Sequence, residues 1–289
     1  MFRGIGTALI TPMNKDGTVD EEALRRLVDF QEENGIDMLL PCGSTGEAAT
    51  LSSEEHLKVI KIVVDQAKKA KVVAGAGSNC TREAVELSSK AADYGADGLL
   101  SISPYYVKPT QEGIFRHYEA IAKASDLPII IYNVPGRTGS NITAETEIRM
   151  AEIPNIAGVK EASGDIEQIQ AILAKRPKGF TVLSGDDSMT YDVMCSGGDG
   201  VFSVVSNCLP KQCSDMVHSL QNGDRNKARD LHNELLPLFK GAFVESNPIP
   251  IKYIMSKMGF GTNTLRLPLT PLTKANQEKL DEMIAQWGL

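Results

Sequence analysis

A lysine interrupts the apolar run "IAGVKEASG" at residues 156–164. The first four residues have the near-continuous hydrophobicity of a strand covered on both faces, and Lys160 follows before that character ends. Burying an ammonium group is unfavourable by several kcal/mol unless it is compensated. Two interpretations follow. The lysine buries its stem and extends its head to solvent, or it lies in a dry pocket that lowers its pKa, where the free amine can attack a carbonyl and form a Schiff base.

Two loops carry further groups that could act with such a lysine. In "GSTGE", Ser44 and Thr45 stand between glycines after an apolar run, which makes a nest of N–H and O–H donors suited to a carboxylate. In "YNVPGRTG", Tyr132 ends another run and Arg137 follows, with a planar fork for a second carboxylate. Each group also has a plainer interpretation, namely a capped turn, a core tyrosine and a solvated arginine.

Short apolar runs alternate with amphipathic helical segments along most of the chain. Eight such runs recur roughly every 20 to 33 residues, the rhythm of β/α units: "GIGTALITP", "DMLLPCG", "KVVAGAG", "GLLSISPYY", "PIIIYNVP", "IAGVKEA", "TVLSGDD" and "GVFSVVSN". No GxGxxG turn follows the first run, so an open nucleotide-binding sheet is disfavoured. The pattern predicts an α/β fold, a closed (β/α)8 TIM barrel, with the polar groups above on the face formed by the carboxyl ends of the strands.

The pattern changes near residue 224. Residues 1–223 are predicted to form the barrel as a catalytic domain, and residues 224–289 a C-terminal helical region packed on or beside it. In the first helix of that region Leu231, Leu235 and Leu238 fall on one side. Elsewhere, helix N-caps are predicted at a set of Ser, Thr and Asp residues that precede helical segments: Asp20, Ser53, Thr81, Thr143 and Asp165.

The composition argues against several classes of partner and site. The net charge is −7 and the basic residues are scattered, so nucleic-acid binding is not expected. The five cysteines have no CxxC spacing and the four histidines lie in helical segments, so neither a metal site nor a cofactor is predicted. No run approaches the roughly 18 residues of a membrane span, and no signal-peptide pattern is seen, so a cytoplasmic protein without a membrane partner is expected.

Taken together, these stretches resemble the dihydrodipicolinate synthase family. The likeness covers essentially the whole chain, in order and at about the family's spacing, through "GSTGEAATLS", "SPYYVKPTQEG", "YNVPGRTG", "GVKEASGD", "LSGDD", "NPIPIK" and "LRLPLTP". The wider group includes N-acetylneuraminate lyase and 2-keto-3-deoxy sugar-acid aldolases, which share the barrel, the lysine, the tyrosine and a similar glycine loop. The Arg137 segment discriminates, because those lyases and aldolases usually have no arginine there.

The resemblance implies a lyase that condenses pyruvate with L-aspartate-4-semialdehyde to 4-hydroxy-2,3,4,5-tetrahydrodipicolinate, in lysine and diaminopimelate biosynthesis. Lys160 would form the Schiff base with pyruvate, whose carboxylate would sit on Ser44 and Thr45. A proton relay would consist of Tyr132, Ser44 and Tyr106. In the family the equivalent of Tyr106 enters the site of a neighbouring subunit, so a tight dimer would be the minimal active unit and a homotetramer, a dimer of dimers, the usual assembly.

The resemblance also assigns binding residues and reveals departures. Arg137 would hold the carboxylate of the semialdehyde, and Gly185 and Phe202 would line the pocket. Ser44 stands where the family more often has threonine, so the methyl group that would fix its rotamer is missing. Phe202 is bulkier than the aliphatic residue usual at its position, which would narrow the pocket.

Some members of the family are inhibited by L-lysine at the dimer interface. The corresponding positions here are Ala49, His56, Asn79, Glu83 and Tyr105. Glu83 and Asn79 could pair with an amino acid, but Ser53 occupies a place where inhibited enzymes often carry histidine. Plain solvation explains an exposed helix glutamate equally well, so the sequence leaves both interpretations open.

Two other functions compete with the leading one. The first is an aldolase of the same group that acts on N-acetylneuraminate or a 2-keto-3-deoxy sugar acid, which Arg137 disfavours because a polyhydroxylated chain needs neutral partners. The second is a catalytically inactive protein that binds pyruvate and regulates another process. It is disfavoured because Lys160, Tyr132, Tyr106 and the Ser44 hydroxyl are all present.

Overall fold

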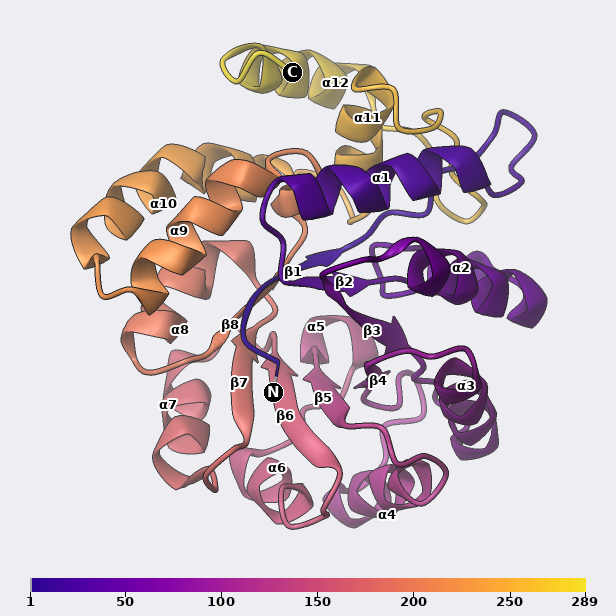
Figure 1. Cartoon of the computed structure of the whole chain (residues 1–289), viewed down its shortest axis with the longest axis vertical. Coiled ribbons are helices and arrows are strands. Elements are labelled where there is room, and N and C mark those ends of the chain that lie inside the picture. Colours follow the sequence, from indigo (N-terminus) through magenta and orange to yellow (C-terminus); the bar gives the residue numbers. More distant parts are fainter. Residues whose placement is uncertain (1) are drawn as a thin grey trace.

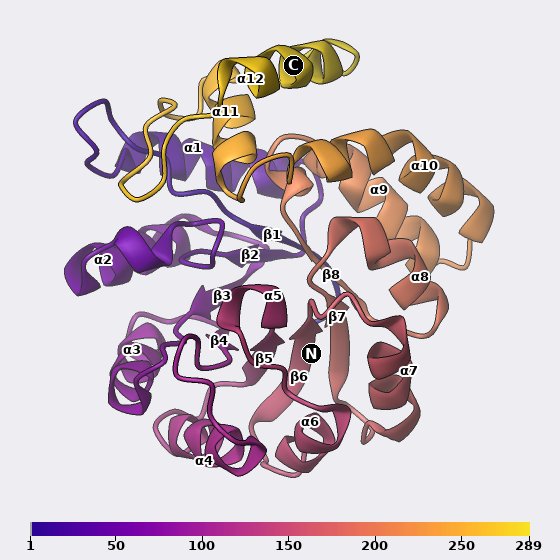
Figure 2. The ribbon, with the colours of Figure 1, turned by 180° about the vertical axis from the view of Figure 1, so that it is seen from behind.

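The computed structural model describes residues 2–289, and the eight apolar runs form a closed parallel barrel, as predicted. Each strand pairs with the next, and β8 pairs with β1 to close the ring (Figures 1 and 2). The strands are β1 (Gly4–Ala8), β2 (Met38–Leu40), β3 (Lys71–Gly75), β4 (Gly98–Ile102), β5 (Ile129–Asn133), β6 (Ile156–Glu161), β7 (Thr181–Ser184) and β8 (Gly200–Ser203). The prediction of a (β/α)8 fold is confirmed.

Helices surround the barrel on its outside (Figure 1). They are α1 (Glu21–Glu33), α2 (Ser53–Gln66), α3 (Thr81–Asp93), α4 (Gln111–Ala122), α6 (Ala144–Met150), α7 (Ile166–Lys175), α8 (Thr190–Cys195) and α9 (Pro210–Gln221). Shorter turns follow individual strands, namely α5 (Pro135–Thr138), η1 (Ala48–Thr50), η2 (Asp187–Met189) and η3 (Val205–Asn207). These turns lie at the carboxyl ends of the strands, where the polar motifs of the sequence are found.

Three of the predicted N-caps are confirmed. Asp20, Thr143 and Asp165 each accept a hydrogen bond from a backbone N–H in the first turn of their helix. The prediction at Ser53 is wrong by one residue, because Ser52 caps α2 and forms a capping box with Glu55.

The N-cap predicted at Thr81 is also wrong. This residue is the first of α3, and Cys80 precedes it without a side-chain cap. The Thr81 hydroxyl instead lies 2.9 Å from Nδ1 of His117 on α4. The Thr81 hydroxyl therefore bonds to a side chain of another helix, although local sequence predicts that it caps its own helix.

The interior of the barrel is filled by one compact cluster of buried side chains, with Ala8, Met38, Leu40, Val73, Leu100, Ile130, Leu183 and Phe202 among its members. Phe202 is the bulkiest residue that is almost fully enclosed there, at 1% exposure. A Cβ atom at Gly6 would lie 2.4 Å from the Phe202 ring, so glycine at that position provides the space that the ring fills. The glycines of "GIGTAL" therefore serve packing.

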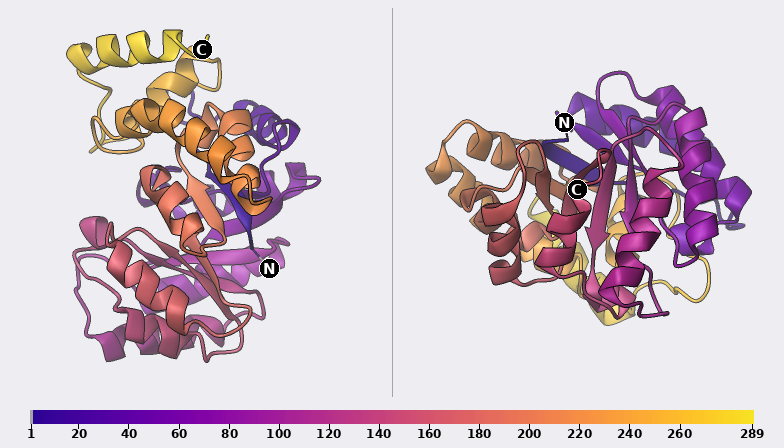
Figure 3. Two further views of the ribbon diagram at one scale, coloured as in Figure 1. Left: turned by 90° about the vertical axis from the view of Figure 1, so that its left-hand side faces the viewer. Right: turned by 90° about the horizontal axis from the view of Figure 1, so that it is seen from below.

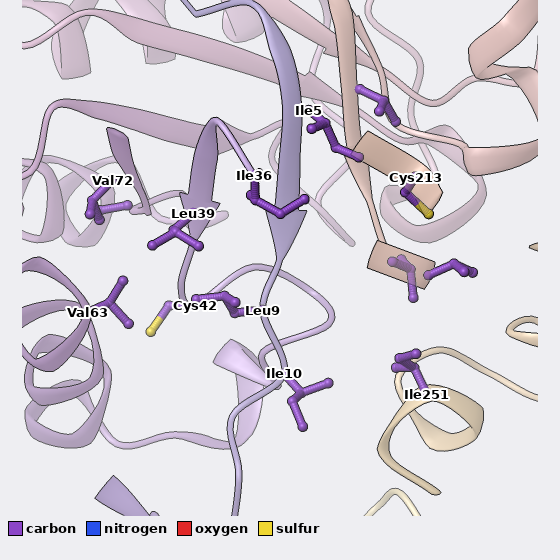
Figure 4. Packing of buried hydrophobic residues seen from close by; sticks show 14 of the residues in the cluster. Ile5, Leu9, Ile10, Ile36, Leu39, Cys42, Val63, Val72, Cys213 and Ile251 are labelled. Carbon is purple, nitrogen blue, oxygen red and sulfur yellow. The ribbon is translucent and has the colours of Figure 1, made fainter. Parts of the chain in front are cut away.

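The larger part of the core lies between the barrel and its helices. Figure 4 shows part of it, from Val63 of α2 and Val72 of β3 to Cys213 of α9 and Ile251 of the C-terminal region. Outward-facing strand residues such as Ile5 are fully buried by this layer. Strands buried on both faces explain the continuous apolar runs of the sequence.

Three helices form the C-terminal region: α10 (Arg225–Gly241), α11 (Ile249–Lys257) and α12 (Lys274–Ala285). Helix α10 lies against α9, α11 contacts η3, and α12 contacts both α10 and α11 (Figure 3). One continuous core cluster contains Leu235 and Ile251 together with barrel residues. The division at residue 223 stays a prediction. Among the helices of residues 2–289, none has the length and apolar character needed to cross a membrane.

Candidate active site

A cavity of about 130 Å³ opens at the carboxyl end of the barrel. Six of the residues singled out in the sequence line it together: Ser44, Thr45, Tyr132, Arg137, Lys160 and Gly185. They come from the ends of β2, β5, β6 and β7, or from the loops that follow these strands. This is the face on which (β/α)8 enzymes carry their chemistry.

Lys160 lies on β6 beside Tyr132 of β5, with which it is in register. The residue is 5% exposed, which excludes the interpretation of a head group in bulk solvent. Its Nζ lies 4.3 Å from the centre of the Tyr132 ring. Burial lowers the pKa of Lys160 to about 7; the Asp187 carboxylate works against this shift and Arg137 adds to it. A substantial fraction of the amine is therefore uncharged, and nucleophilic, near neutral pH.

The phenol of Tyr132 is held protonated. Tyr132 is buried, and burial raises its pKa, while the charge of Arg137 and a hydrogen bond with Ser44 oppose the rise. A neutral phenol next to an amine can give a proton to a developing oxygen anion and take it back. Ser44, in the "GSTGE" loop, lines the same cavity as this phenol.

Two groups suited to a carboxylate line the cavity together with the lysine. Thr45 is buried at the cavity wall and its Oγ1 accepts a hydrogen bond of 3.0 Å from Nδ2 of Asn247. Arg137 lies in α5, and its Nη2 donates to the backbone carbonyl of Asn247 at 3.0 Å. Its remaining N–H groups are free to bind a carboxylate at the cavity. The cavity thus combines a buried amine, a phenol and two groups whose chemistry is suited to carboxylates.

The whole chain is similar to proteins of one known family. The model of the dihydrodipicolinate synthetase family matches residues 1–287. The chain belongs to this family. The 4-hydroxy-tetrahydrodipicolinate synthase of Chloroherpeton thalassium is 52% identical over 288 residues, which cover 99% of this chain and 95% of that protein.

Solved structures of the family have the same fold. Dihydrodipicolinate synthase from Aquifex aeolicus superposes with a TM-score of 0.98 at 43% identity, covering 100% of this chain and 99% of that one. The chloride-inhibited dihydrodipicolinate synthase from Acinetobacter baumannii, determined in complex with pyruvate, gives 0.97 at 44% identity, with coverages of 100% and 99%. The family membership expected from the sequence motifs is confirmed over the whole chain.

Phe202 lies below the cavity rather than in its lining. Its ring centre is 5.6 Å from Nζ of Lys160, and its bulk is accommodated inside the barrel against Gly6. The departure from the aliphatic residue usual in the family therefore changes the packing inside the barrel beneath Lys160. It does not narrow the cavity wall in the way that the sequence comparison implied.

Tyr106 is not part of the cavity of its own chain. It lies in the loop after β4, is 87% exposed, and has a backbone φ of 71°, in the left-handed region that non-glycine residues seldom adopt. Its N–H donates to the backbone carbonyl of Thr138 at 3.0 Å, which fixes the loop beside α5. A role for Tyr106 in the family's proton relay therefore requires a second copy of the chain, and stays a prediction.

A second cavity of about 450 Å³ adjoins the first and shares Ser44, Tyr132 and Arg137 with it. Four of the five positions that the resemblance assigned to an L-lysine site line it: Ala49, His56, Glu83 and Tyr105. Asn79 is not part of the lining, but its Nδ2 donates to the backbone carbonyl of Tyr105 at 3.2 Å. Burial lowers the pKa of His56, and its Nε2 lies 2.7 Å from the carbonyl of Gly75.

Two residues that act on the site, Asp187 beside it and Asn247 in its lining, were not assigned a role from the sequence. Asp187, after β7, is 3% exposed, accepts N–H groups of Val204 and Val205 at 2.9 and 3.1 Å, and has a pKa that burial raises to about 6. Asn247 comes from the C-terminal region. The "LSGDD" and "NPIPIK" motifs contain these residues, but burial and partners, which distinguish them, are not visible in the sequence.

No group of three or more metal-ligating side chains occurs within residues 2–289.

Proposed function

We propose that the chain condenses pyruvate with L-aspartate-4-semialdehyde and releases 4-hydroxy-2,3,4,5-tetrahydrodipicolinate and water. The observation that carries this proposal is the buried Lys160 amine, with a pKa near 7, in one cavity with Arg137. The amine accounts for the keto acid and the guanidinium for a second substrate that carries a carboxylate.

The first half of the reaction takes place on Lys160. The neutral amine attacks the ketone carbon of pyruvate while Thr45 and the Ser44 loop hold the pyruvate carboxylate. Tyr132 gives a proton to the departing hydroxyl, so water leaves and an iminium forms. The positive nitrogen makes the methyl group acidic, and transfer of one methyl proton back to the Tyr132 phenolate gives an enamine.

The second half joins the two substrates. Arg137 binds the carboxylate of the semialdehyde and brings its aldehyde carbon to the enamine. The enamine carbon attacks the aldehyde, Tyr132 protonates the resulting alkoxide, and the iminium is restored. The amine of the adduct then attacks the iminium carbon and displaces Lys160, which closes the ring and frees the enzyme.

A neighbouring copy would complete the proton relay. We propose that Tyr106, exposed on its own chain, enters the partner's cavity in a tight dimer, that two dimers form a homotetramer, and that the enzyme works in the cytoplasm. Mixing Tyr106→Phe with Lys160→Ala tests the exchange of Tyr106. Mixed dimers then contain one complete site, so activity should return, whereas a Tyr106 that served its own chain would restore none. Sedimentation velocity gives the assembly.

A coupled assay with both classes of substrate tests the proposed reaction. L-aspartate-4-semialdehyde with pyruvate should give turnover, whereas N-acetylneuraminate and a 2-keto-3-deoxy sugar acid should release no pyruvate. Cleavage of a sugar acid without any use of the semialdehyde would overturn the proposal in favour of an aldolase. The inactive-binder alternative is tested by borohydride reduction with pyruvate followed by mass measurement, because an enzyme retains a pyruvate-sized increment that disappears in Lys160→Ala.

We also propose that L-lysine binds in the second cavity and inhibits the enzyme. Glu83 supports this proposal, because its carboxylate lies at the lining of that cavity and is suited to an ammonium group. Glu83→Gln should weaken inhibition, while Glu86→Gln, which is exposed on the same helix, should leave it unchanged. Equal inhibition of the parent and Glu83→Gln would show that this carboxylate only serves solvation.

A further inference from the structure

Asn247 of the C-terminal region contacts both groups that bind the substrate carboxylates in the proposed function. It stands between α10 and α11, is 5% exposed, and lines the cavity that contains Lys160. Its side-chain Nδ2 donates to the hydroxyl of Thr45, and its backbone carbonyl accepts from Arg137, each at 3.0 Å. A residue outside the eight β/α units is therefore the common neighbour of two residues within them.

The direction of the bond to Thr45 has a chemical consequence. A hydroxyl group has one hydrogen to donate and two lone pairs to accept with. Because the Asn247 amide donates to Thr45, the hydroxyl hydrogen of Thr45 remains free to point into the cavity. A carboxylate can only accept hydrogen bonds, so this arrangement leaves the Thr45 hydroxyl in the one state in which it can donate to the keto-acid carboxylate.

The other end of the Asn247 amide supports a role for its N–H group. Oδ1 is buried and has no hydrogen-bond partner within residues 2–289. A buried acceptor without a partner destabilises a fold, and an apolar side chain of similar size would avoid that penalty. The position holds an amide nonetheless, and the contact that it makes is the donation to Thr45.

A buried ion pair holds the same loop a few residues further on. Nζ of Lys252, on α11, donates to Glu47 at 2.5 Å and to the carbonyl of Thr264 at 2.7 Å. Both charged side chains are fully enclosed. Glu47 ends the "GSTGE" loop with a φ of 55°, so the loop is fixed at Glu47 by one contact and at Thr45 by the other.

We propose that Asn247 is a positioning residue for both carboxylate sites. Its amide N–H keeps the Thr45 hydroxyl as a donor toward the keto-acid carboxylate, and its carbonyl holds Arg137 beside it for the carboxylate of the second substrate. The inference rests on the proposed function, since it assigns Thr45 and Arg137 to the two substrates.

Asn247→Asp tests the direction of the hydrogen bond. The change preserves size and the backbone carbonyl, but a carboxylate takes the hydrogen of Thr45 and leaves its lone pairs toward the cavity. We expect kcat/KM for pyruvate to fall about 30-fold or more, while the KM for the semialdehyde changes less than about threefold. Asn247→Leu, with similar size and no hydrogen bond, should lower kcat/KM for pyruvate by about threefold only.

A double-mutant cycle separates hydrogen-bond direction from the added negative charge. A Thr45→Val background has no hydroxyl whose hydrogen bond could be reversed. There Asn247→Asp should lower kcat/KM for pyruvate much less than it does in the parent, whereas an effect of charge repulsion would persist. An undiminished effect in that background, or an Asn247→Leu variant as impaired as Asn247→Asp, overturns the inference. Thermal unfolding followed by circular dichroism identifies variants whose fold has changed. If Asn247→Leu is one of them, Asn247→Ser takes its place in the comparison with Asn247→Asp.

Failure of this inference is distinguishable from failure of the proposed function. If the parent protein retains no pyruvate-sized increment after borohydride reduction, the proposed function fails. If the parent retains the increment and turns over the semialdehyde, but Asn247→Asp does not impair the pyruvate kinetics more than Asn247→Leu does, only the role of Asn247 is wrong.

Discussion

The two ends of the barrel use charged residues in different ways. At the amino ends of the strands, Asp37, Asp97 and Asp199 accept backbone N–H groups of Ile5, Val72 and Val182 at 2.8 to 2.9 Å. Two of these carboxylates are also paired with cationic side chains, Asp37 with His218 and Asp199 with Arg176. Each of these three carboxylates has a hydrogen-bond partner, so they stabilise the fold at this end.

At the carboxyl ends, charged groups are buried with weaker compensation. Burial lowers the pKa of Lys160 to about 7 and raises that of Asp187 to about 6. Groups perturbed in this way are expected where a protein performs chemistry. The difference is that carboxylates at the amino ends hold backbone groups of the strands, whereas burial shifts the pKa values of Lys160 and Asp187 at the carboxyl ends, where the candidate site lies.

Lys160→Arg should have the largest effect, because it removes the nucleophile at the carboxyl ends of the strands. The substitution retains the charge but cannot form the iminium, so turnover should fall by about 1,000-fold or more and no pyruvate increment should be trapped. Steady-state kinetics and mass measurement after borohydride reduction test it. Lys211→Arg, which alters an exposed ion pair on α9, is the matched control and should retain activity. A Lys160→Arg enzyme with near-normal rate would contradict the mechanism.

Arg137→Ala should have the next largest effect. Loss of the guanidinium should lower kcat/KM for L-aspartate-4-semialdehyde by about 100-fold, while pyruvate adduct formation persists, because only the second carboxylate loses its partner. Arg116→Ala removes an exposed arginine paired with Glu112 and is the control. Equal loss of adduct and turnover would indicate that Arg137 mainly holds the structure of α5.

The pH dependence of adduct formation tests the pKa of Lys160 and the effect of the Asp187 charge on it. Only the neutral amine attacks pyruvate, so the rate should rise with pH through a midpoint near the Lys160 pKa of about 7. The Asp187 charge favours the ammonium form, so Asp187→Asn should move this midpoint to lower pH. Stopped-flow adduct formation across the pH range measures it. An unmoved or raised midpoint would mean that Asp187 does not act on Lys160.

The smallest expected effect is on stability, and it concerns the His218–Asp37 pair at the amino ends of the strands. A hydrogen bond to Asp37, ahead of the opposing effect of burial, raises the pKa of His218, so the protonated histidine is stabilised in the folded state. This stability is fully present below the unfolded pKa of about 6.5 and is lost as pH rises through the folded pKa. His218→Asn should therefore destabilise the protein by about 0.5 kcal/mol more at about pH 5.5 than at about pH 8.5.

Urea unfolding at the two pH values measures the His218 effect. Turnover of His218→Asn should match the parent, because the residue lies at the end of the barrel away from the cavity. A pH-independent destabilisation would assign the contact to packing, and a loss of turnover would remove the distinction between the two ends.

Much of the fold and of the candidate site could be predicted from local pattern. Strands buried on both faces require continuous apolar runs, so the rhythm of those runs predicted the barrel. A lysine inside such a run is unusual enough to mark Lys160, and the rule that chemistry gathers at the carboxyl ends of the strands brought Tyr132 and Ser44 to the same face. These features depend on neighbours in the chain or on the regularity of the barrel.

Other features depend on contacts that local pattern does not encode. Asn247 is 202 positions from Thr45 and 110 from Arg137, and nothing in "NPIPIK" indicates which residue faces the cavity. The hydroxyl of Thr81 binds His117 on the next helix, although its position in the sequence is typical of a cap. Phe202 fits below the lysine only because Gly6, on the strand beside it, has no side chain.

The sequence by itself determined the architecture and the chemical type of the site, because hydrophobic periodicity and residue type act within one strand or helix. The tertiary structure alone decided how deeply the lysine is buried, that the Asn247 amide donates to the Thr45 hydroxyl, and that the C-terminal region reaches the "GSTGE" loop. The physical reason is that a pKa and the direction of a hydrogen bond depend on all atoms within a few ångströms, and most of those atoms come from distant parts of the chain.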